Sequence, residues 1–499
     1  MLFRSAFRLF PLHLHDLAEH ARGELCETDA PAARLDFAQP EVRRAVEAVR
    51  GKVGDEVGAF VKGGGRWDGH GATLAAGVGG ASARGNGIVA GGQGAYGARR
   101  CLRPLLQKKL LRLGGAGRWA FRGCFSIDMI YFDHNASYPL SVAARSAWMD
   151  AVECFVGNPS SPHRLGSRAD AALCEARTKL ADWLGCDAAE IVWTSGATEA
   201  NNTVLHHAAL SGASEVWVSA IEHPCVLAAA RRYFQRTHRL IPVSQQGVVD
   251  LAWLAEELKK RRPGLVAVMA ANNETGVVQP WREMLALCRE REVPFFCDAA
   301  QWVGKLPVGG LGGCDYMTGT AHKVGGPQGV GFIKCPVKFH PLLVGGPQEE
   351  GRRAGTENVA GVLAMIAALE ERETKLANAG TAQYLARRMG FENRLARELP
   401  DAKIVGATAE RLWNTVSVVM PELPDCRQRW VVRLDRQGFA VSTGSACASG
   451  KEQTSHVLAA MGFSAGEASR VLRFSSGLET TEEDWSHLLA ALARAAQDR

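Results

Sequence analysis

Short apolar segments of strand length alternate with helical segments along the chain from Met129 onward. The strand-like segments are 190–194 (EIVWT), 215–220 (EVWVSA), 264–270 (GLVAVMA), 293–297 (VPFFC), 315–319 (DYMTG) and 330–335 (VGFIKC). Continuous apolar strands separated by helices are typical of a parallel sheet that is buried on both faces. The alternation therefore predicts an α/β fold with a mostly parallel sheet.

The same pattern predicts how this part of the chain is divided. Helices are expected over 141–155 and 168–185, with a loop at 157–166 (GNPSSPHRLG) between them. Beyond about residue 370 a long helical stretch is followed by scattered short strands, which is typical of an α+β arrangement. We predict a large α/β domain over 129–370, whose first residues (129–145) pack toward a smaller α+β C-terminal domain over 371–499.

Residues 1–128 lack this alternation. The stretch from Gly63 to Gly97 holds 14 glycines with little apolar periodicity, which favours disorder. Its first residues are acid-free and carry arginine, as in an organellar transit peptide, although acidic residues follow from Asp16. A start codon assigned too far upstream is the simpler interpretation, with Met129 as the initiator. We expect a cytoplasmic protein, or an organellar one if the segment is a transit peptide.

Composition excludes several classes of protein. No apolar run approaches the roughly 20 residues of a membrane span. The 13 cysteines form no CxxC pair, which favours a reducing compartment over a disulfide framework or a zinc ribbon. The net charge of +6 comes from residues 1–128, with 19 Lys and Arg against 12 Asp and Glu, so the remainder is close to neutral. We therefore expect no nucleic-acid partner and no membrane association.

One lysine and one aspartate lie where two of the predicted strands end. Lys323 lies in DYMTGTAHKVGGPQGVG, where an apolar strand runs into a glycine-rich turn, and Asp298 ends VPFFCD. Pyridoxal phosphate chemistry requires such a pair: an amine that forms the Schiff base and a carboxylate that keeps the pyridine nitrogen protonated. A solvated lysine is the alternative for Lys323 taken alone.

A phosphate site is predicted where EIVWTSGATEANN passes from strand into helix. The free N–H groups of the helix start, including those near Ala197, and the Thr198 hydroxyl converge at one point. An ordinary Ser/Thr helix cap is the alternative.

Three further polar residues follow strands at the same predicted edge of the sheet. His223 in SAIEHPCVL is placed to stack on a planar ring and to carry protons, or else is a loop histidine with a satisfied hydrogen bond. Asn273 in AANNETG is a neutral donor toward a phenolate or a carboxylate, and Gln301 is within reach of a ring oxygen. Turn formation is the alternative for these two amides.

The C-terminal part supplies a thiol and a guanidinium. Cys447 lies in STGSACASG, a loop of small residues that suits a mobile thiolate nucleophile. Arg473, in VLRFSSG, is a natural bidentate clamp for an amino acid carboxylate.

Taken together, residues 129 to about 485 resemble the NifS/IscS-type cysteine desulfurases of the class V aminotransferase group. The resemblance rests on YFDHNASYP, GNPSSPHRLG, TSGATEANN, EHPCVL, NNETGVVQP, DAAQWVGKLPV, TAHKVGGPQGVG, GGPQEEGRRAGTEN, STGSACASG and RFSSG, in the family's order. It implies the fold type I of pyridoxal phosphate-dependent transferases, with a seven-stranded sheet.

The resemblance also implies a role for each site residue. Lys323 would form the Schiff base, Asp298 would contact the pyridine nitrogen, and His223 would stack on the ring. Gln301 and Asn273 would lie near the ring oxygen, and Asn273 would also face the substrate that Arg473 clamps. The phosphate site would be formed by Ala197, Thr198, Thr320 and His322. Thr356 would contact the partner subunit's cofactor in a homodimer. Cys447 would form the persulfide.

The predicted reaction converts L-cysteine to L-alanine and leaves its sulfur on Cys447. Lys323 is the expected base at Cα and His223 the expected proton carrier near the thiol. The sulfur then passes to an acceptor protein for iron–sulfur cluster, thio-cofactor or tRNA biosynthesis, a choice that the sequence leaves open. No resident metal is expected, although Cys447 could contact an iron–sulfur cluster transiently. The alternatives are a selenocysteine lyase and a non-catalytic scaffold derived from the family.

Overall fold

The structure is a computed structural model that describes residues 129–423, 426–443 and 455–497. All of these belong to one unit, Ala98–Arg499. The predictions made for residues 1–128 and for Cys447 lie outside the described residues.

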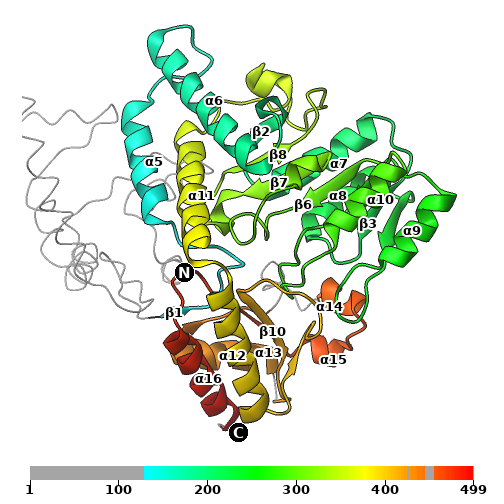
Figure 1. Cartoon of the computed structure of the whole chain (residues 1–499), viewed down its shortest axis with the longest axis vertical. Helices are drawn as coiled ribbons and strands as arrows, with labels where there is room; N and C mark the ends of the chain where they lie inside the picture. Colours follow the sequence, from blue (N-terminus) through cyan, green and yellow to red (C-terminus); the bar gives the residue numbers. More distant parts are fainter. Residues whose placement is uncertain (1–128, 424–425, 444–454, 498–499) are drawn as a thin grey trace, which may run out of the picture. The chain divides into compact units, whose positions relative to one another are not determined.

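A seven-stranded mixed sheet forms the centre of this unit (Figure 1). Its strands, in spatial order, are β2 (Ile191–Thr194), β8 (Gly331–Lys334), β7 (Tyr316–Thr320), β6 (Phe295–Asp298), β5 (Leu265–Ala267), β3 (Val216–Ser219) and β4 (His238–Ile241). β8 runs antiparallel to both of its neighbours, and all other pairs are parallel. The predicted α/β fold with a mostly parallel sheet of seven strands is therefore confirmed.

Helices cover both faces of this sheet, so its strands are largely apolar, except β4 at the edge. The helices are α5 (Val142–Cys154), α6 (Arg164–Leu184), α7 (Ala197–Leu210), α8 (Pro224–Phe234), α9 (Leu251–Lys260), α10 (Trp281–Glu290) and α11 (Val359–Ala379). Adjacent strand residues point to opposite cores: Phe295 packs with α6, α9, α10 and α11, whereas Phe296 packs with α7 and α8. This alternation along a strand is what places the residue at each strand end on a defined face.

Short 3-10 helices connect several of these elements. They are η3 (Ala188–Glu190), η4 (Leu311–Gly313), η5 (Ala321–Lys323) and η6 (Gln348–Gly351). η5 matters most for function, because it follows β7 directly and contains the predicted Schiff-base lysine.

A smaller antiparallel sheet and its helices form the C-terminal part. The sheet consists of β12 (Val471–Ser475), β10 (Thr415–Val419) and β9 (Lys403–Ile404), in that order. The first described strand, β1 (Ile130–Tyr131), pairs in parallel with β11 (Phe439–Ala440). The helices here are α12 (Ala382–Glu398), α13 (Cys426–Arg436), α14 (His456–Ala460), α15 (Ala465–Ala468) and α16 (Glu482–Gln497). The proposed boundary at 370 falls inside α11, and the division into two domains remains a prediction.

Two local details differ from the sequence prediction. α6 begins at Arg164 and not at 168, because His163 caps it by accepting a hydrogen bond from Gly166 N at 3.2 Å. The sequence pattern also gave no strand at His238–Ile241, where β4 lies at the sheet edge. Three of its four residues remain partly or fully exposed, so it lacks the apolar run that marks the buried strands.

No helix in the described part of the chain is long and apolar enough to cross a membrane. The expected cytoplasmic location remains a prediction.

Candidate active site

The predicted site residues gather at one edge of the large sheet, where its parallel strands end. β6 ends at Asp298, and the neighbouring β7 ends at Thr320, just before Lys323 in η5. β5 and β3 precede the loops that carry Asn273 and His223. Because β3, β5, β6 and β7 are adjacent and parallel, their carboxyl ends meet at the same edge, which is the usual position of a binding site in an open α/β sheet.

Lys323 is half-buried, and its amine is held at this edge by two carbonyl oxygens. Nζ donates to Asn135 O at 2.6 Å and to Ala136 O at 2.8 Å, both in the turn that follows β1. The sheet edge and the start of the described chain therefore meet at the lysine.

Asp298 is a buried carboxylate whose orientation is fixed by hydrogen bonds. Oδ1 accepts from Ala300 N at 2.9 Å, and Oδ2 accepts from Asn201 Nδ2 at 2.6 Å. Asn201, in α7, is itself oriented by Thr318, whose hydroxyl donates to Asn201 Oδ1 at 2.6 Å. Asn201 was not among the site residues predicted from the sequence. Its position three residues after Thr198 on the same helix was the available signal.

The start of α7 is suited to an anion. Gly196 precedes the helix with φ 147° and ψ 176° and makes no side-chain cap, so the first N–H groups, from Ala197 on, have no partner within the helix. Backbones approach closely here, because a Cβ on Gly331 would lie 2.6 Å from Gly196 Cα. A Cβ on Gly196 would lie 3.6 Å from Thr320 Oγ1, so Thr320 adjoins the predicted phosphate site.

His322 and Thr198 have different settings in this region. Thr198 is exposed at the helix start, where a ligand can reach it. His322 is half-buried, and burial, followed by the positive charge of Lys323, lowers its pKa to about 4. At neutral pH His322 is therefore an uncharged hydrogen-bonding partner.

His223 caps the N-terminus of α8 at the same edge. Its Nδ1 accepts from Cys225 N at 3.3 Å and lies 2.9 Å from the Cys225 sulfur. Burial lowers the pKa of His223, while the nearby Asp298 opposes that shift. Its predecessor Glu222 is fully buried, and burial, followed by the charge of Asp298, raises its pKa to about 8.

Arg473 reaches the site from β12 in the smaller sheet and is 1% exposed. Its guanidinium donates to Asn273 O at 2.8 Å and to Asp133 Oδ1 at 2.6 Å. The structure therefore joins the two residues that were assigned to a substrate carboxylate, through the main chain of Asn273. The side chain of Asn273 is half-buried beside them.

Gln301 is held in a buried network beneath the site. Its Nε2 donates to Asn135 O at 3.0 Å, and its Oε1 accepts from Lys305 Nζ. Lys305, which is fully buried, also donates to Asn135 Oδ1 at 2.7 Å. Both ends of the Gln301 amide are thus engaged, and its contact with a ring oxygen remains a prediction. Asn135 and Lys305 were not among the site residues predicted from the sequence.

The segment that contains Cys447 is attached next to this site on both sides. On one side Ser442 pairs with Arg473, with N–O distances of 3.2 and 2.8 Å. On the other side Ser455 Oγ donates to Glu274 Oε2 at 2.6 Å, and His456 Nε2 lies 2.8 Å from Glu222 O. Thr356 is exposed, and its contact with a partner subunit remains a prediction.

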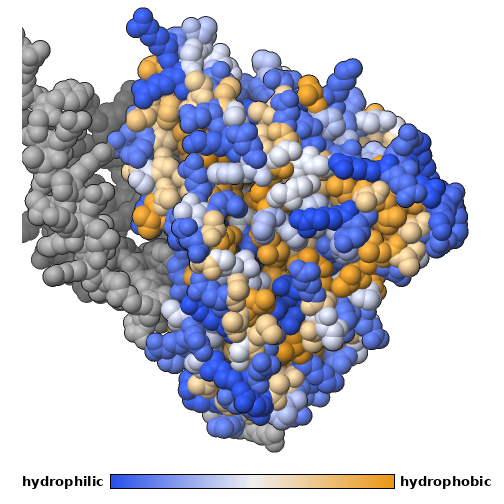
Figure 2. Space-filling view, in the orientation of Figure 1, coloured by the Kyte–Doolittle hydropathy of each residue, from blue (hydrophilic) through white to orange (hydrophobic). Residues whose placement is uncertain are grey.

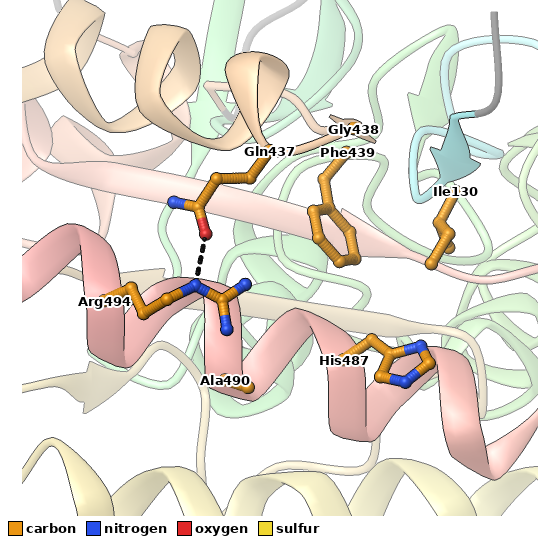
Figure 3. A pocket seen from close by; sticks show the side chains of 7 residues that line it. All are labelled: Ile130, Gln437, Gly438, Phe439, His487, Ala490 and Arg494. Carbon is orange, nitrogen blue, oxygen red and sulfur yellow. Dashed lines mark hydrogen bonds between the residues drawn. The ribbon is translucent and has the colours of Figure 1, made fainter.

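A separate pocket of about 270 Å³ lies in the C-terminal part (Figure 3). Its lining residues are Ile130, Gln437, Gly438, Phe439, His487, Ala490 and Arg494. Gln437 Oε1 accepts a hydrogen bond from Arg494 Nε at 2.9 Å across its wall. None of the predicted site residues lines this pocket.

Comparison with known proteins defines the class of this enzyme. Residues 130–488 match the model of the aminotransferase class-V family. The chain belongs to this family, whose enzymes depend in general on pyridoxal phosphate.

Within the family, the relatives narrow the assignment. A cysteine desulfurase of Klebsiella pneumoniae is 37% identical over 375 residues, which cover 73% of this chain and 92% of the relative. A solved NifS-like protein of Rickettsia africae is 28% identical with a TM-score of 0.67, covering 74% of this chain and 99% of the relative. A solved complex of SspA with cysteine is 28% identical with a TM-score of 0.60, covering 69% of this chain and 98% of the SspA chain. The chain is a NifS/IscS-like cysteine desulfurase, as the resemblance implied.

Proposed function

We propose that this enzyme uses pyridoxal phosphate to convert L-cysteine to L-alanine and takes the sulfur onto Cys447 as a persulfide. The observation that carries this proposal is the placement of Lys323 and Asp298 at the ends of two adjacent parallel strands. In balanced form, L-cysteine and the Cys447 thiol give L-alanine and the Cys447 persulfide. When bound, the cofactor supplies an electron sink for this chemistry.

The residues at the sheet edge fit the cofactor. The uncapped start of α7, with Ala197 and Thr198, together with Thr320, suits the phosphate group. His322 adds an uncharged hydrogen-bonding group. The buried Asp298 carboxylate suits the pyridine nitrogen, and the amine of Lys323 suits the carbonyl carbon.

The other site residues act on the substrate. Lys323 Nζ removes the Cα proton, and His223 carries a proton near the substrate thiol. Arg473 and Asn273 hold the substrate carboxylate, with Asp133 as the present counter-ion of the guanidinium.

Chain length limits where Cys447 can lie relative to these groups. Three residues separate Thr443 from Cys447, and an extended chain spans at most about 3.6 Å per residue, so the Cα atoms of these two residues stay within about 15 Å of each other. Thr443 follows Ser442, whose backbone pairs with Arg473. This tether supports direct sulfur transfer from the substrate to Cys447, followed by delivery to an acceptor protein.

Two substitutions test this assignment. Purified Lys323→Ala is expected to lose the visible absorbance of bound cofactor and all alanine formation, because no other amine is assigned to the cofactor's carbonyl carbon. Cys447→Ser is expected to keep that absorbance but to form no persulfide, as measured by mass spectrometry after incubation with L-cysteine. Retained absorbance in Lys323→Ala, or native alanine formation in Cys447→Ser, would contradict the assignment.

We also propose that the enzyme is a homodimer. α5 exposes an apolar face, with Val142 75%, Met149 59% and Val152 53% accessible, and Val156 continues it at 72% (Figure 2). Val142, Met149 and Val152 lie at spacings of seven and three, which places them on one side of the helix, and Val156 follows just after the end of α5. Apolar side chains gathered in this way favour a protein partner, and Thr356 is exposed as a contact to a partner subunit requires.

A further inference from the structure

A second thiol, that of Cys225, lies inside the candidate active site. Cys225 is the second residue of α8, and its sulfur lies 2.9 Å from His223 Nδ1 and 3.3 Å from Asn201 Nδ2. Asn201 also donates to Asp298 Oδ2 at 2.6 Å. The thiol therefore connects the histidine assigned to proton transfer with the amide that orients the cofactor-facing carboxylate.

The hydrogen-bond donors around His223 fix the position of its proton. Nδ1 accepts the backbone N–H of Cys225 at 3.3 Å, and a backbone N–H can only donate. Nδ1 therefore carries no proton, and the thiol at 2.9 Å must donate its own hydrogen to the same nitrogen. The neutral imidazole then holds its proton on Nε2.

The amide on the other side of the thiol is equally constrained. Asn201 Oδ1 accepts from Thr318 Oγ1 at 2.6 Å, which leaves Nδ2 to donate both to Asp298 and to the Cys225 sulfur. The thiol thus accepts a hydrogen bond from Asn201 and donates one to His223, and both of these partners are set by the fold. The side chain of Thr198, at the start of α7, also forms a hydrogen bond with Cys225.

We propose that Cys225 is a positioning residue for His223, whose thiol adds a second donor to Nδ1 beside its own backbone N–H and so strengthens the hold on the tautomer that carries the transferable proton on Nε2. This inference rests on the proposed role of His223 as proton carrier. The neutral state of the thiol supports it, because burial, followed by the charge of Asp298, raises the pKa of Cys225 to about 12. A neutral thiol is a hydrogen-bond donor and a poor nucleophile, which favours a positioning role for Cys225 over that of a second sulfur acceptor.

The thiol also affects the pKa of His223. A donor on Nδ1 stabilises the neutral imidazole, so its removal raises this pKa. The charged or titratable groups that act on His223 from other elements are Asp298 at the end of β6, Lys323 in η5 and His456 in α14. Each of them is unchanged in a Cys225 variant, which isolates the contribution of the thiol.

The test uses the full-length holoenzyme with 15N-labelled histidine rings. The chain has 14 histidines, and His223→Gln assigns the His223 signals by their loss. The wild type is expected to show an unprotonated Nδ1 and a protonated Nε2 at neutral pH. In Cys225→Ala the pKa of His223 should rise by about half a unit to one unit, as expected for the loss of one ordinary hydrogen bond.

Cys225→Ser and Cys288→Ala are the matched variants. Serine keeps a donor beside Nδ1 and should return the His223 pKa to within a few tenths of the wild-type value. Cys288 is a buried thiol in α10, so its removal leaves a comparable cavity and should not move the His223 pKa. Turnover of L-cysteine should fall by about threefold to tenfold in Cys225→Ala, in kcat and not in KM, and recover in Cys225→Ser.

The possible outcomes separate this inference from the proposed function. A wild-type ring protonated on Nδ1, or a serine variant that matches the alanine variant in pKa, overturns the positioning role. The 15N signals of the His223 ring report its tautomer and its pKa without any measurement of turnover. If His223→Gln keeps native turnover, the proton-carrying role of His223 fails, while the ring signals still decide what Cys225 does to its tautomer.

Discussion

Individual residues at this site differ in how far the sequence revealed them. Lys323 and Asp298 were predictable because each follows an apolar strand, and strand ends in a parallel sheet share one edge. Asn201, Cys225 and Lys305 were not, because a polar residue in a helix or a turn gives no local sign of the distant group that it contacts. Asn201 and Lys305 have partners far away in the sequence: 97 positions separate Asn201 from Asp298, and 170 separate Lys305 from Asn135. Cys225 lies only two positions from His223, but the direction of its thiol is decided by the fold.

At the residue scale, Glu222 leads to a pH-dependent prediction. Burial, followed by the charge of Asp298, raises its pKa from 4.5 to about 8, so the folded state keeps a proton that the unfolded state has released above pH 4.5. The contribution of Glu222 to stability is therefore fully present below pH 4.5 and is lost as pH rises through about 8.

Glu222→Gln removes this titration while keeping the side-chain shape and an oxygen for the hydrogen bond from Met269 N. The free energy of unfolding of the variant, relative to the wild type, should increase by about 1 kcal/mol per pH unit between pH 5 and 8. Urea unfolding at pH 5, 6.5 and 8 measures it. A difference that is constant across these pH values would show that Glu222 is ionised in the folded protein.

At the scale of elements, the start of α7 depends on one glycine. Gly196 has φ 147° and ψ 176°, a conformation that is essentially restricted to glycine. It lets the chain turn from β2 into the helix with the first N–H groups free for an anion. The general position of this helix start was predictable, because strand, small residues and helix follow one another in the sequence.

Gly196→Ala should lower the free energy of unfolding by about 1–3 kcal/mol and weaken cofactor binding, because alanine cannot adopt this φ without strain. The added Cβ would meet only Thr320 Oγ1, at 3.6 Å, so strain and not crowding is the cause. Urea unfolding and titration of the apoenzyme with pyridoxal phosphate measure the two effects.

Gly390→Ala is the matched control. Gly390 lies exposed within α12, and a Cβ there would meet nothing within 4 Å. Alanine in a helix interior should raise stability by about 0.5–1 kcal/mol. If Gly196→Ala and Gly390→Ala changed the free energy of unfolding equally, the Gly196 conformation would not be the cause of the loss.

At the scale of the whole molecule, the site is assembled from both sheets. Asn135 follows β1, and its side chain bonds to Thr415 Oγ1 at 2.9 Å and to Lys305 Nζ at 2.7 Å, while its carbonyl accepts from Lys323. Arg473 reaches the same place from β12. The smaller sheet thus contributes residues to the candidate active site and is not only a support for it.

The proposed homodimer is tested at this scale. Light scattering should give about twice the 53.6 kDa chain mass for the wild type. Met149→Glu should shift the enzyme to monomer, because an interface would have to bury two carboxylates without partners. Val432→Glu in α13, at a residue that is 46% exposed, is the control and should remain dimeric. A monomeric wild type would contradict the homodimer, and a dimeric Met149→Glu would place the interface away from α5.

The sequence alone determined the α/β class, the mostly parallel sheet and the lysine and aspartate at its edge, because these follow from local apolar periodicity and from the geometry of parallel strands. It missed β4, whose partly exposed residues lack an apolar run. Only the tertiary structure decided the partners of those residues: the two carbonyls on Lys323, the Asn201 amide on Asp298 and the Cys225 thiol on His223. The physical reason is that a hydrogen bond depends on the direction and distance of its two groups in the folded protein. Local sequence patterns specify neither, whether the partners are two positions apart, as for Cys225 and His223, or 188, as for Lys323 and Asn135.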